Sequence, residues 1–132
     1  MSLVKIYSEI LLTAEGKALA TYGEGGVNVV PVSTIRLIGE EIVLVNYFLN
    51  KTLSNLKANP EVALACWKGF EGFQIKGQAR YETEGEIFDE IVVWIKEILP
   101  DRTVKGIIVI KPAEVFDITA SSTRAGQVVG RG

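Results

Sequence analysis

The segment 50–60 combines several groups that bind phosphate in proteins. Its sequence, Asn-Lys-Thr-Leu-Ser-Asn-Leu-Lys-Ala-Asn-Pro, lies between two apolar runs that contain β-branched residues. The pattern predicts a short helix that begins at an Asn50 cap and ends before Pro60. The unpaired N–H groups and the positive dipole end of a helix start attract anions, and Lys51 and Thr52 add a cation and a hydroxyl there. The segment therefore predicts a phosphate site, and its alternative is an ordinary capped helix with a solvated lysine.

Other side chains give weaker signals. Ser33 and Thr34, at the end of an expected strand, could hydrogen-bond a polar ligand edge or could simply face solvent. Trp67 and Phe70 flank a Gly-rich loop, where they could line a pocket or belong to the core or an interface. The acidic run within 82–90 has charges that suit a helix start, so it indicates a solvated helix end rather than a metal site or a pair of catalytic carboxylates.

The residue types that the chain lacks exclude several kinds of chemistry. It contains no histidine and one cysteine, Cys66. A Ser-His-Asp triad, a Cys-His pair, a His-ligated zinc site and a four-cysteine metal site are therefore excluded within one chain type. A lone cysteine also rules out an intramolecular disulfide. No side chain can be assigned as a general acid or base, so redox or transfer chemistry would have to come from a bound cofactor.

The length and composition of the chain indicate its number of domains, its oligomeric state and its kinds of partner. The length of 132 residues predicts one domain, 1–132, and 48% of the residues are hydrophobic although only 8% are aromatic. This apolar content exceeds what a small core needs and predicts a buried interface in a homodimer. A net charge of −2 argues against nucleic acid as a partner. No leader and no apolar run long enough to cross a bilayer is present, so no membrane partner is expected and the expected location is the cytoplasm.

Hydrophobic periodicity predicts the elements that position the candidate residues. About six strands joined by hairpins, with helices at intervals, predict a mainly β fold with flanking helices, a closed antiparallel six-stranded β-barrel. The expected helices are 3–15, 51–58 and a helix that runs from a capping box at Thr83 and Glu86 to Pro100. The expected strands are 18–22, 27–34, 41–47, 61–67, 73–83 and a last strand or pair of strands, 106–110 and 114–119, that is broken at 111–113. Turns are expected at 23–26 and 36–40, and a loose tail over 119–132.

Three parts of the chain carry a resemblance to a known family. They are 29–34 (Val-Val-Pro-Val-Ser-Thr), then 43–46 leading to 50–52 and 59–64, then 72–79 (Gly-Phe-Gln-Ile-Lys-Gly-Gln-Ala). In this order and spacing they resemble the FMN-binding split-barrel family, which includes pyridoxamine 5′-phosphate oxidases and small FMN-binding proteins. The resemblance extends from about Gly16 to Thr119 and is closer to the small FMN-binding proteins. It implies a split barrel and a homodimer with FMN near the interface.

The resemblance also implies which residues hold the cofactor. The FMN phosphate would lie on the helix start, at Lys51 and Thr52 with Asn50 beside them. The remaining positions would lie along the flavin ring, the ribityl chain and the phosphate arm: Pro31, Val32, Ser33, Thr34, Asn46, Tyr47 and Phe48.

Departures from the family pattern narrow the expected function. Pyridoxamine phosphate oxidases have a flavin-contacting Gln near the position of Gly72, and a C-terminal extension whose His, Arg and aromatic residues serve cofactor and substrate. This chain has no His and ends soon after Thr119, so that activity is not expected. The expected function is an FMN-binding oxidoreductase or flavin electron carrier with a small-molecule or protein redox partner. The alternatives are a non-catalytic protein that stores or senses FMN, and a deazaflavin or pyridoxal phosphate bound in the same place.

Overall fold

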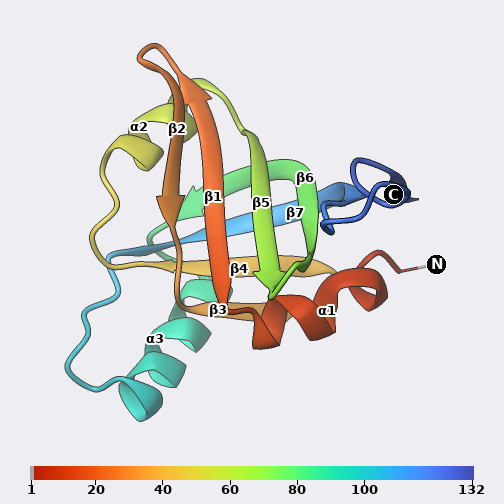
Figure 1. Ribbon diagram of the computed structural model, residues 1–132. Coiled ribbons are helices and arrows are strands. Elements are labelled where there is room, and N and C mark those ends of the chain that lie inside the picture. Colours follow the sequence, from red (N-terminus) through yellow and green to blue (C-terminus); the bar gives the residue numbers. More distant parts are fainter. Residues whose placement is uncertain (1) are drawn as a thin grey trace.

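A computed structural model describes residues 2–132, within which three helices and eight strands form (Figure 1). The helices are α1 (Val4–Thr13), α2 (Lys51–Ala58) and α3 (Glu86–Ile98). The strands are β1 (Gly16–Gly23), β2 (Gly26–Pro31), β3 (Ile35–Ile38), β4 (Glu41–Asn46), β5 (Glu61–Lys68), β6 (Glu71–Glu82), β7 (Gly106–Asp117) and β8 (Val128–Arg131).

All eight strands of residues 2–132 belong to one antiparallel sheet. Its order is β2-β1-β5-β6-β7-β4-β3, and β8 pairs with β7. The long strand β6 curves from the layer of β2, β1 and β5 to the layer of β7, β4 and β3 (Figure 1). Its pairing with β7 shifts register between Lys76 and Gly77, and such a bulge bends a sheet.

The antiparallel, mainly β architecture with flanking helices is confirmed, but closure into a six-stranded barrel is not. The end strands of the order are β2 and β3, and no backbone ladder joins them within residues 2–132. The additional strands are β3, where a turn was expected, and β8, where a loose tail was expected. Ile35 and Leu37 lie opposite Leu44 and Ile42, so β3 forms because it extends the apolar ladder of β4.

Strands β4 and β7 are buried on both faces, which explains their continuous apolar sequences. On one face, Ile42, Leu44, Ile108 and Ile110 pack into the barrel interior with residues of α1, β1, β5 and β6. On the other face, the alternate residues pack against α3: Val43, Val45, Ile107 and Val109. The two clusters fix the end of β4, which leads directly into the 47–52 segment.

Two expected side-chain caps do not form. Asn50 occupies the cap position of α2, but its side chain makes no capping hydrogen bond; its carbonyl instead accepts the N–H groups of Leu53 and Ser54 at 3.1 and 3.2 Å. The helix α3 has no capping box, because Gly85, at φ 107°, leads the chain into the helix directly before Glu86. A backbone at positive φ suits glycine and bypasses the expected cap at Thr83.

The C-terminal segment is tied to the sheet rather than loose. The carboxylate of Asp117 accepts the backbone N–H of Thr119 at 2.8 Å and the Nε–H of Arg124 at 3.2 Å. These hydrogen bonds hold the pKa of Asp117 below its usual value although burial opposes them. The chain then returns along β7 as β8. Within residues 2–132, no helix is both long and apolar enough to cross a membrane.

The buried hydroxyl of Tyr7 gives a first prediction. Tyr7 is fully buried, and its hydroxyl has no hydrogen-bond partner among residues 2–132. Replacing Tyr7 with Phe removes an unsatisfied polar group and is expected to raise the free energy of unfolding by about 1–3 kcal/mol, measured by urea denaturation at pH 7.

The same substitution is expected to change the alkaline pH dependence of stability. Burial, and then the charges of Glu40 and Cys66, raise the pKa of Tyr7 to about 12. Because an unfolded tyrosine ionises near pH 10, the folded state is disfavoured as the pH rises from about 10 toward 12. Tyr7→Phe should therefore lose less stability over this range than the unmodified protein. An equal loss of stability in Tyr7→Phe and in the unmodified protein would contradict the assignment.

Candidate functional site

The predicted strand-end residues lie next to each other where β2, β4 and α2 meet. The backbone N–H of Val45 donates to the carbonyl of Thr34 at 3.1 Å, and the Tyr47 hydroxyl donates to Thr34 Oγ1 at 3.1 Å. These two bonds hold the β2–β3 connection against the end of β4. The structure thus brings together segments that were predicted separately as parts of one cofactor site.

Asn46 fixes the path from β4 to α2. Its side chain is buried, donates from Nδ2 to the Tyr81 hydroxyl at 2.8 Å, and accepts the N–H of Leu49 at 2.7 Å. Tyr81 can approach because residue 106, opposite Asn46, is glycine, and a Cβ there would collide with the tyrosine ring. Asn46 therefore positions the segment that leads into α2. Both polar atoms of its side chain already have hydrogen-bond partners within the protein.

The first two residues of α2 have different surroundings. Lys51 is exposed and extends toward the β1–β2 turn, where a Cβ on Gly25 would lie 3.7 Å from its Nζ. Thr52 is buried, and its hydroxyl accepts a hydrogen bond from Asn28 Nδ2 at 3.2 Å. The structure therefore leaves the Lys51 ammonium accessible to a ligand, whereas it places the Thr52 hydroxyl against β2. Asn50 and Phe48 are exposed beside them.

A hollow of about 490 Å³ adjoins this junction on the side of β1 and β2. Pro31, Val32 and Ser33 line it, together with residues of β1 and the indole of Trp67. Trp67 lies against Gly16, where any side chain would collide with the indole. Ser33 lines the hollow, and the next residue, Thr34, contacts Tyr47, so the segment 31–34 connects an apolar hollow with the end of β4.

Two basic residues of the site were missed by sequence reasoning. The Arg102 guanidinium carbon lies 5.3 Å from the Tyr47 ring centre and 5.6 Å from that of Phe48, and Lys105 Nζ lies 5.9 Å from the Phe48 ring centre. Both belong to the connection between α3 and β7, more than fifty positions from Phe48 in the sequence. The sequence shows two basic residues shortly after Pro100, which ends the helix. No local pattern in the sequence indicates that these residues lie close to the end of β4.

The cations around the junction are not neutralised by neighbouring carboxylates. Within residues 2–132, the ion pairs involve Arg80, Arg124 and Arg131 as the basic partners, and none involves Lys51, Arg102 or Lys105. Unpaired cations around an exposed aromatic residue and a helix start favour an anionic ligand. These exposed cations can therefore bind an anionic group such as a phosphate.

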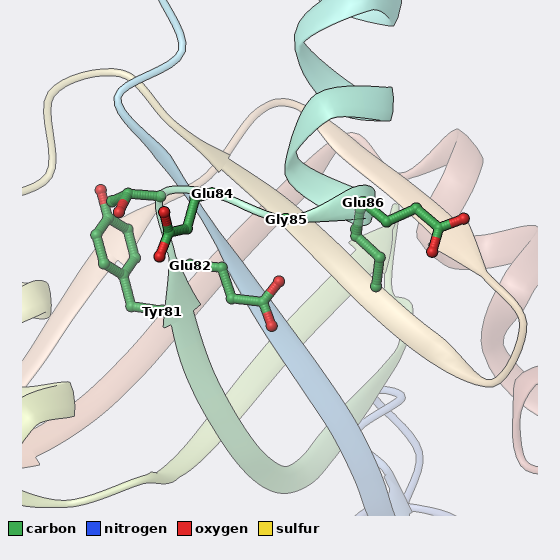
Figure 2. A pocket seen from close by; sticks show the side chains of 7 residues that line it. Tyr81, Glu82, Glu84, Gly85 and Glu86 are labelled. Carbon is green, nitrogen blue, oxygen red and sulfur yellow. The ribbon is translucent and has the colours of Figure 1, made fainter.

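A second hollow, of about 550 Å³, is lined by acidic side chains, whereas the junction described above carries basic ones. It lies between the end of β6 and the start of α3, and Figure 2 shows Glu82, Glu84 and Glu86 around it, with Tyr81 at one side. Carboxylates repel a phosphate, so this larger hollow does not fit the predicted cofactor. Within residues 2–132, no group of three or more metal-ligating side chains is placed to hold a metal ion.

Sequence comparisons relate this chain to known proteins. A sequence model for the family described as pyridoxamine 5′-phosphate oxidase matches residues 7–125. The uncharacterized protein MJ0282 of Methanocaldococcus jannaschii is 32% identical over 137 aligned residues, which cover 98% of this chain and 91% of the relative.

Solved structures share the fold at lower sequence identity. Group A Streptococcus HupZ has a TM-score of 0.79 at 18% identity, over 96% of this chain and 98% of HupZ. An FMN-binding protein from Syntrophomonas wolfei subsp. wolfei has a TM-score of 0.71 at 20% identity, over 90% of this chain and 92% of that protein.

Proposed function

Because the chain belongs to the pyridoxamine 5′-phosphate oxidase family, we propose that it is a flavoprotein that binds FMN and acts as an oxidoreductase or flavin electron carrier. The observation that carries the proposal is that the segment 31–34 borders an apolar hollow and is hydrogen-bonded through Thr34 to Tyr47, in the segment that leads to the basic start of α2. FMN has the same two parts in the same order, a flat ring and a terminal phosphate. When bound, its flavin would supply the capacity to accept and release electrons.

In this proposal each predicted residue has a role that its surroundings allow. Lys51 attracts the phosphate, and Asn50 and the backbone N–H groups of α2 lie next to it. Pro31, Val32 and Ser33 border the ring, while Thr34 and Tyr47 fix the turn between ring and phosphate through their hydrogen bond. Thr52 and Asn46 are buried and position the site through hydrogen bonds. Thr52 holds α2 against β2, and Asn46 holds the segment before α2. Phe48, with its exposed ring, borders the phosphate arm.

A titration tests the proposal. Apo protein is titrated with FMN and, separately, with riboflavin, and binding is followed by the change in flavin fluorescence. We expect FMN to bind more tightly than riboflavin, by at least about tenfold, because riboflavin lacks the phosphate. Equal affinities would contradict the phosphate assignment, and absence of binding would contradict the function. Turnover of the bound flavin with reductants and oxidants then distinguishes a carrier or oxidoreductase from a storage or sensing protein.

The proposal includes a homodimer. Tyr22, Val27 and Val29 form an apolar face on β1 and β2, with exposures of 56%, 79% and 65%. Val29 and Pro31 of the same strand also line the hollow. A second copy on this face would bury the exposed side chains and cover one side of the ring slot.

A charge placed on this face is expected to break the dimer. Val27→Glu should yield a monomer at micromolar concentration, measured by light scattering, because an unpaired carboxylate would be buried in the interface. Leu12→Glu on α1, at a position 58% exposed, is the matched control and should leave the dimer intact. A monomeric unmodified protein, or a dimer that survives Val27→Glu, would contradict this interface.

A further inference from the structure

Four polar side chains form a quartet between the β1–β2 hairpin and α2: Thr21, Asn28, Thr52 and Asn55. Asn55 Nδ2 donates to Thr21 Oγ1 at 3.0 Å, and Asn28 Nδ2 donates to Thr52 Oγ1 at 3.2 Å. Thr21, Thr52 and Asn55 are buried, with exposures of 3%, 1% and 4%. Hydrogen bonds between buried groups fix the register of two packed elements, because a shift leaves a buried donor or acceptor without a partner.

Strand pairing and helix spacing explain how the quartet forms. Thr21 and Asn28 lie opposite each other in the β1–β2 ladder, and both side chains reach α2. Thr52 and Asn55 are three positions apart in α2, so they share one face of the helix. The hairpin is thus joined to α2 at two successive turns, and two attachment points fix the direction of the helix as well as its position.

Close packing at the hairpin adds a third constraint on α2. A Cβ on Gly23 would collide with the Asn55 side chain and would lie 3.1 Å from the Asn55 Cα, so the hairpin approaches the helix this closely because residue 23 is glycine. The helix lies beside the end of the hairpin, and the Lys51 side chain extends toward the turn there (Figure 1). The start of α2 therefore takes its position from the hairpin as well as from Asn46.

We propose that the quartet determines the preference of the site for a phosphorylated flavin over an unphosphorylated one, with Thr21, Asn28 and Asn55 as positioning residues that act through α2. This inference rests on the proposed function for the ligand. Hydrogen bonds to phosphate oxygens depend steeply on the distance and direction of their donors, and those donors are the Lys51 ammonium and the N–H groups at the start of α2. A shift of α2 on the hairpin would move all of them together. The hollow at Ser33 would keep its shape, because no residue of α2 lines it.

The affinities of Thr21 variants for FMN and riboflavin, measured by flavin fluorescence, test the proposal. Thr21→Val has nearly the same shape but leaves Asn55 Nδ2 without its acceptor, and it should lower the ratio of FMN affinity to riboflavin affinity by at least about fivefold. Thr21→Ser keeps the hydroxyl and should restore the ratio. A general loss of structure would weaken both flavins alike, so an unchanged ratio in folded Thr21→Val protein would overturn the proposal.

The matched control is Thr119→Val, which removes another buried threonine hydroxyl, the acceptor of the Gly72 N–H at 3.3 Å. Thr119 follows the end of β7, whereas Asn46, which leads into α2, pairs with the start of that strand. The control should leave the affinity ratio within about twofold of its original value, and an equal fall in the control would overturn the proposal. If circular dichroism shows that Thr21→Val does not fold, Gly23→Ala takes its place, because its Cβ displaces Asn55, and the same fall in the ratio is expected.

The outcomes separate this inference from the proposed function. If the unmodified protein prefers FMN and folded Thr21→Val keeps that preference, the inference alone fails. If the unmodified protein binds neither flavin, the proposed function fails, and calorimetric titration with inorganic pyrophosphate tests the quartet by itself. Thr21→Val should then weaken pyrophosphate binding by at least about fivefold, whereas Thr21→Ser should not. Equal binding by the two variants, or absence of pyrophosphate binding to the unmodified protein, would overturn the inference as well.

Discussion

Replacing Lys51 with alanine is expected to weaken FMN binding by about 1.5–3 kcal/mol, on the order of 10- to 150-fold in Kd. The side chain is exposed at the first position of α2 and forms none of the ion pairs within residues 2–132. Its removal therefore deletes a charge-assisted contact to the phosphate without exposing an unpaired carboxylate. Calorimetric titration of the apo protein with FMN measures the effect.

Two controls separate a lost phosphate contact from a general change in the protein. Lys57→Ala removes the same charge from the last turn of the same helix and should leave the Kd for FMN within about twofold. Riboflavin has no phosphate, so its affinity should not respond to Lys51→Ala. Unchanged FMN affinity in the Lys51 variant would show that the phosphate does not lie on this helix start.

The largest expected loss of stability comes from Ile108→Ala, at about 2–5 kcal/mol. Ile108 is fully buried in β7, opposite Leu44 of β4 on one side and Tyr81 of β6 on the other. Truncation leaves a cavity between three strands that the ladders hold at fixed spacing, so the surroundings can close only partly. Urea denaturation at pH 7 measures the free energy of unfolding.

The matched substitution is Val93→Ala on the outer face of α3, where the side chain is 60% exposed. It should change stability by less than about 0.5 kcal/mol, apart from the small gain in helix propensity. Comparable losses in the two variants would show that the shared interior of β4, β6 and β7 is not the main core of the protein.

The strands that carry the core could be predicted from the sequence, because their apolar runs are continuous or strictly alternating. Along β4 and β7, alternate apolar side chains pack against α3, namely those of Val43, Val45, Ile107 and Val109. The side chains between them pack into the barrel interior. The short strands could not be predicted in the same way. Strand β3 depends on pairing with β4, and β8 on pairing with β7 and on the anchoring of Asp117, which are contacts distant in sequence.

The candidate site was predictable where its residues follow one another along the chain. Asn50, Lys51 and Thr52 start a helix as expected, although the Asn50 side chain does not cap it and the Thr52 hydroxyl points inward to Asn28. Arg102 and Lys105 reach the site only because α3 and β7 return the chain to the end of β4. Side-chain orientation and distant pairing are properties of the packed sheet, and local sequence patterns do not contain them.

The most direct test of the account is the visible absorption spectrum of the protein purified without added cofactor, followed by mass analysis of whatever acid releases. The account predicts a flavin spectrum and the mass of FMN. A deazaflavin or pyridoxal phosphate mass would keep the phosphate site and change the cofactor. A colourless protein that also fails to bind added FMN would contradict the assignment of a flavin to this site.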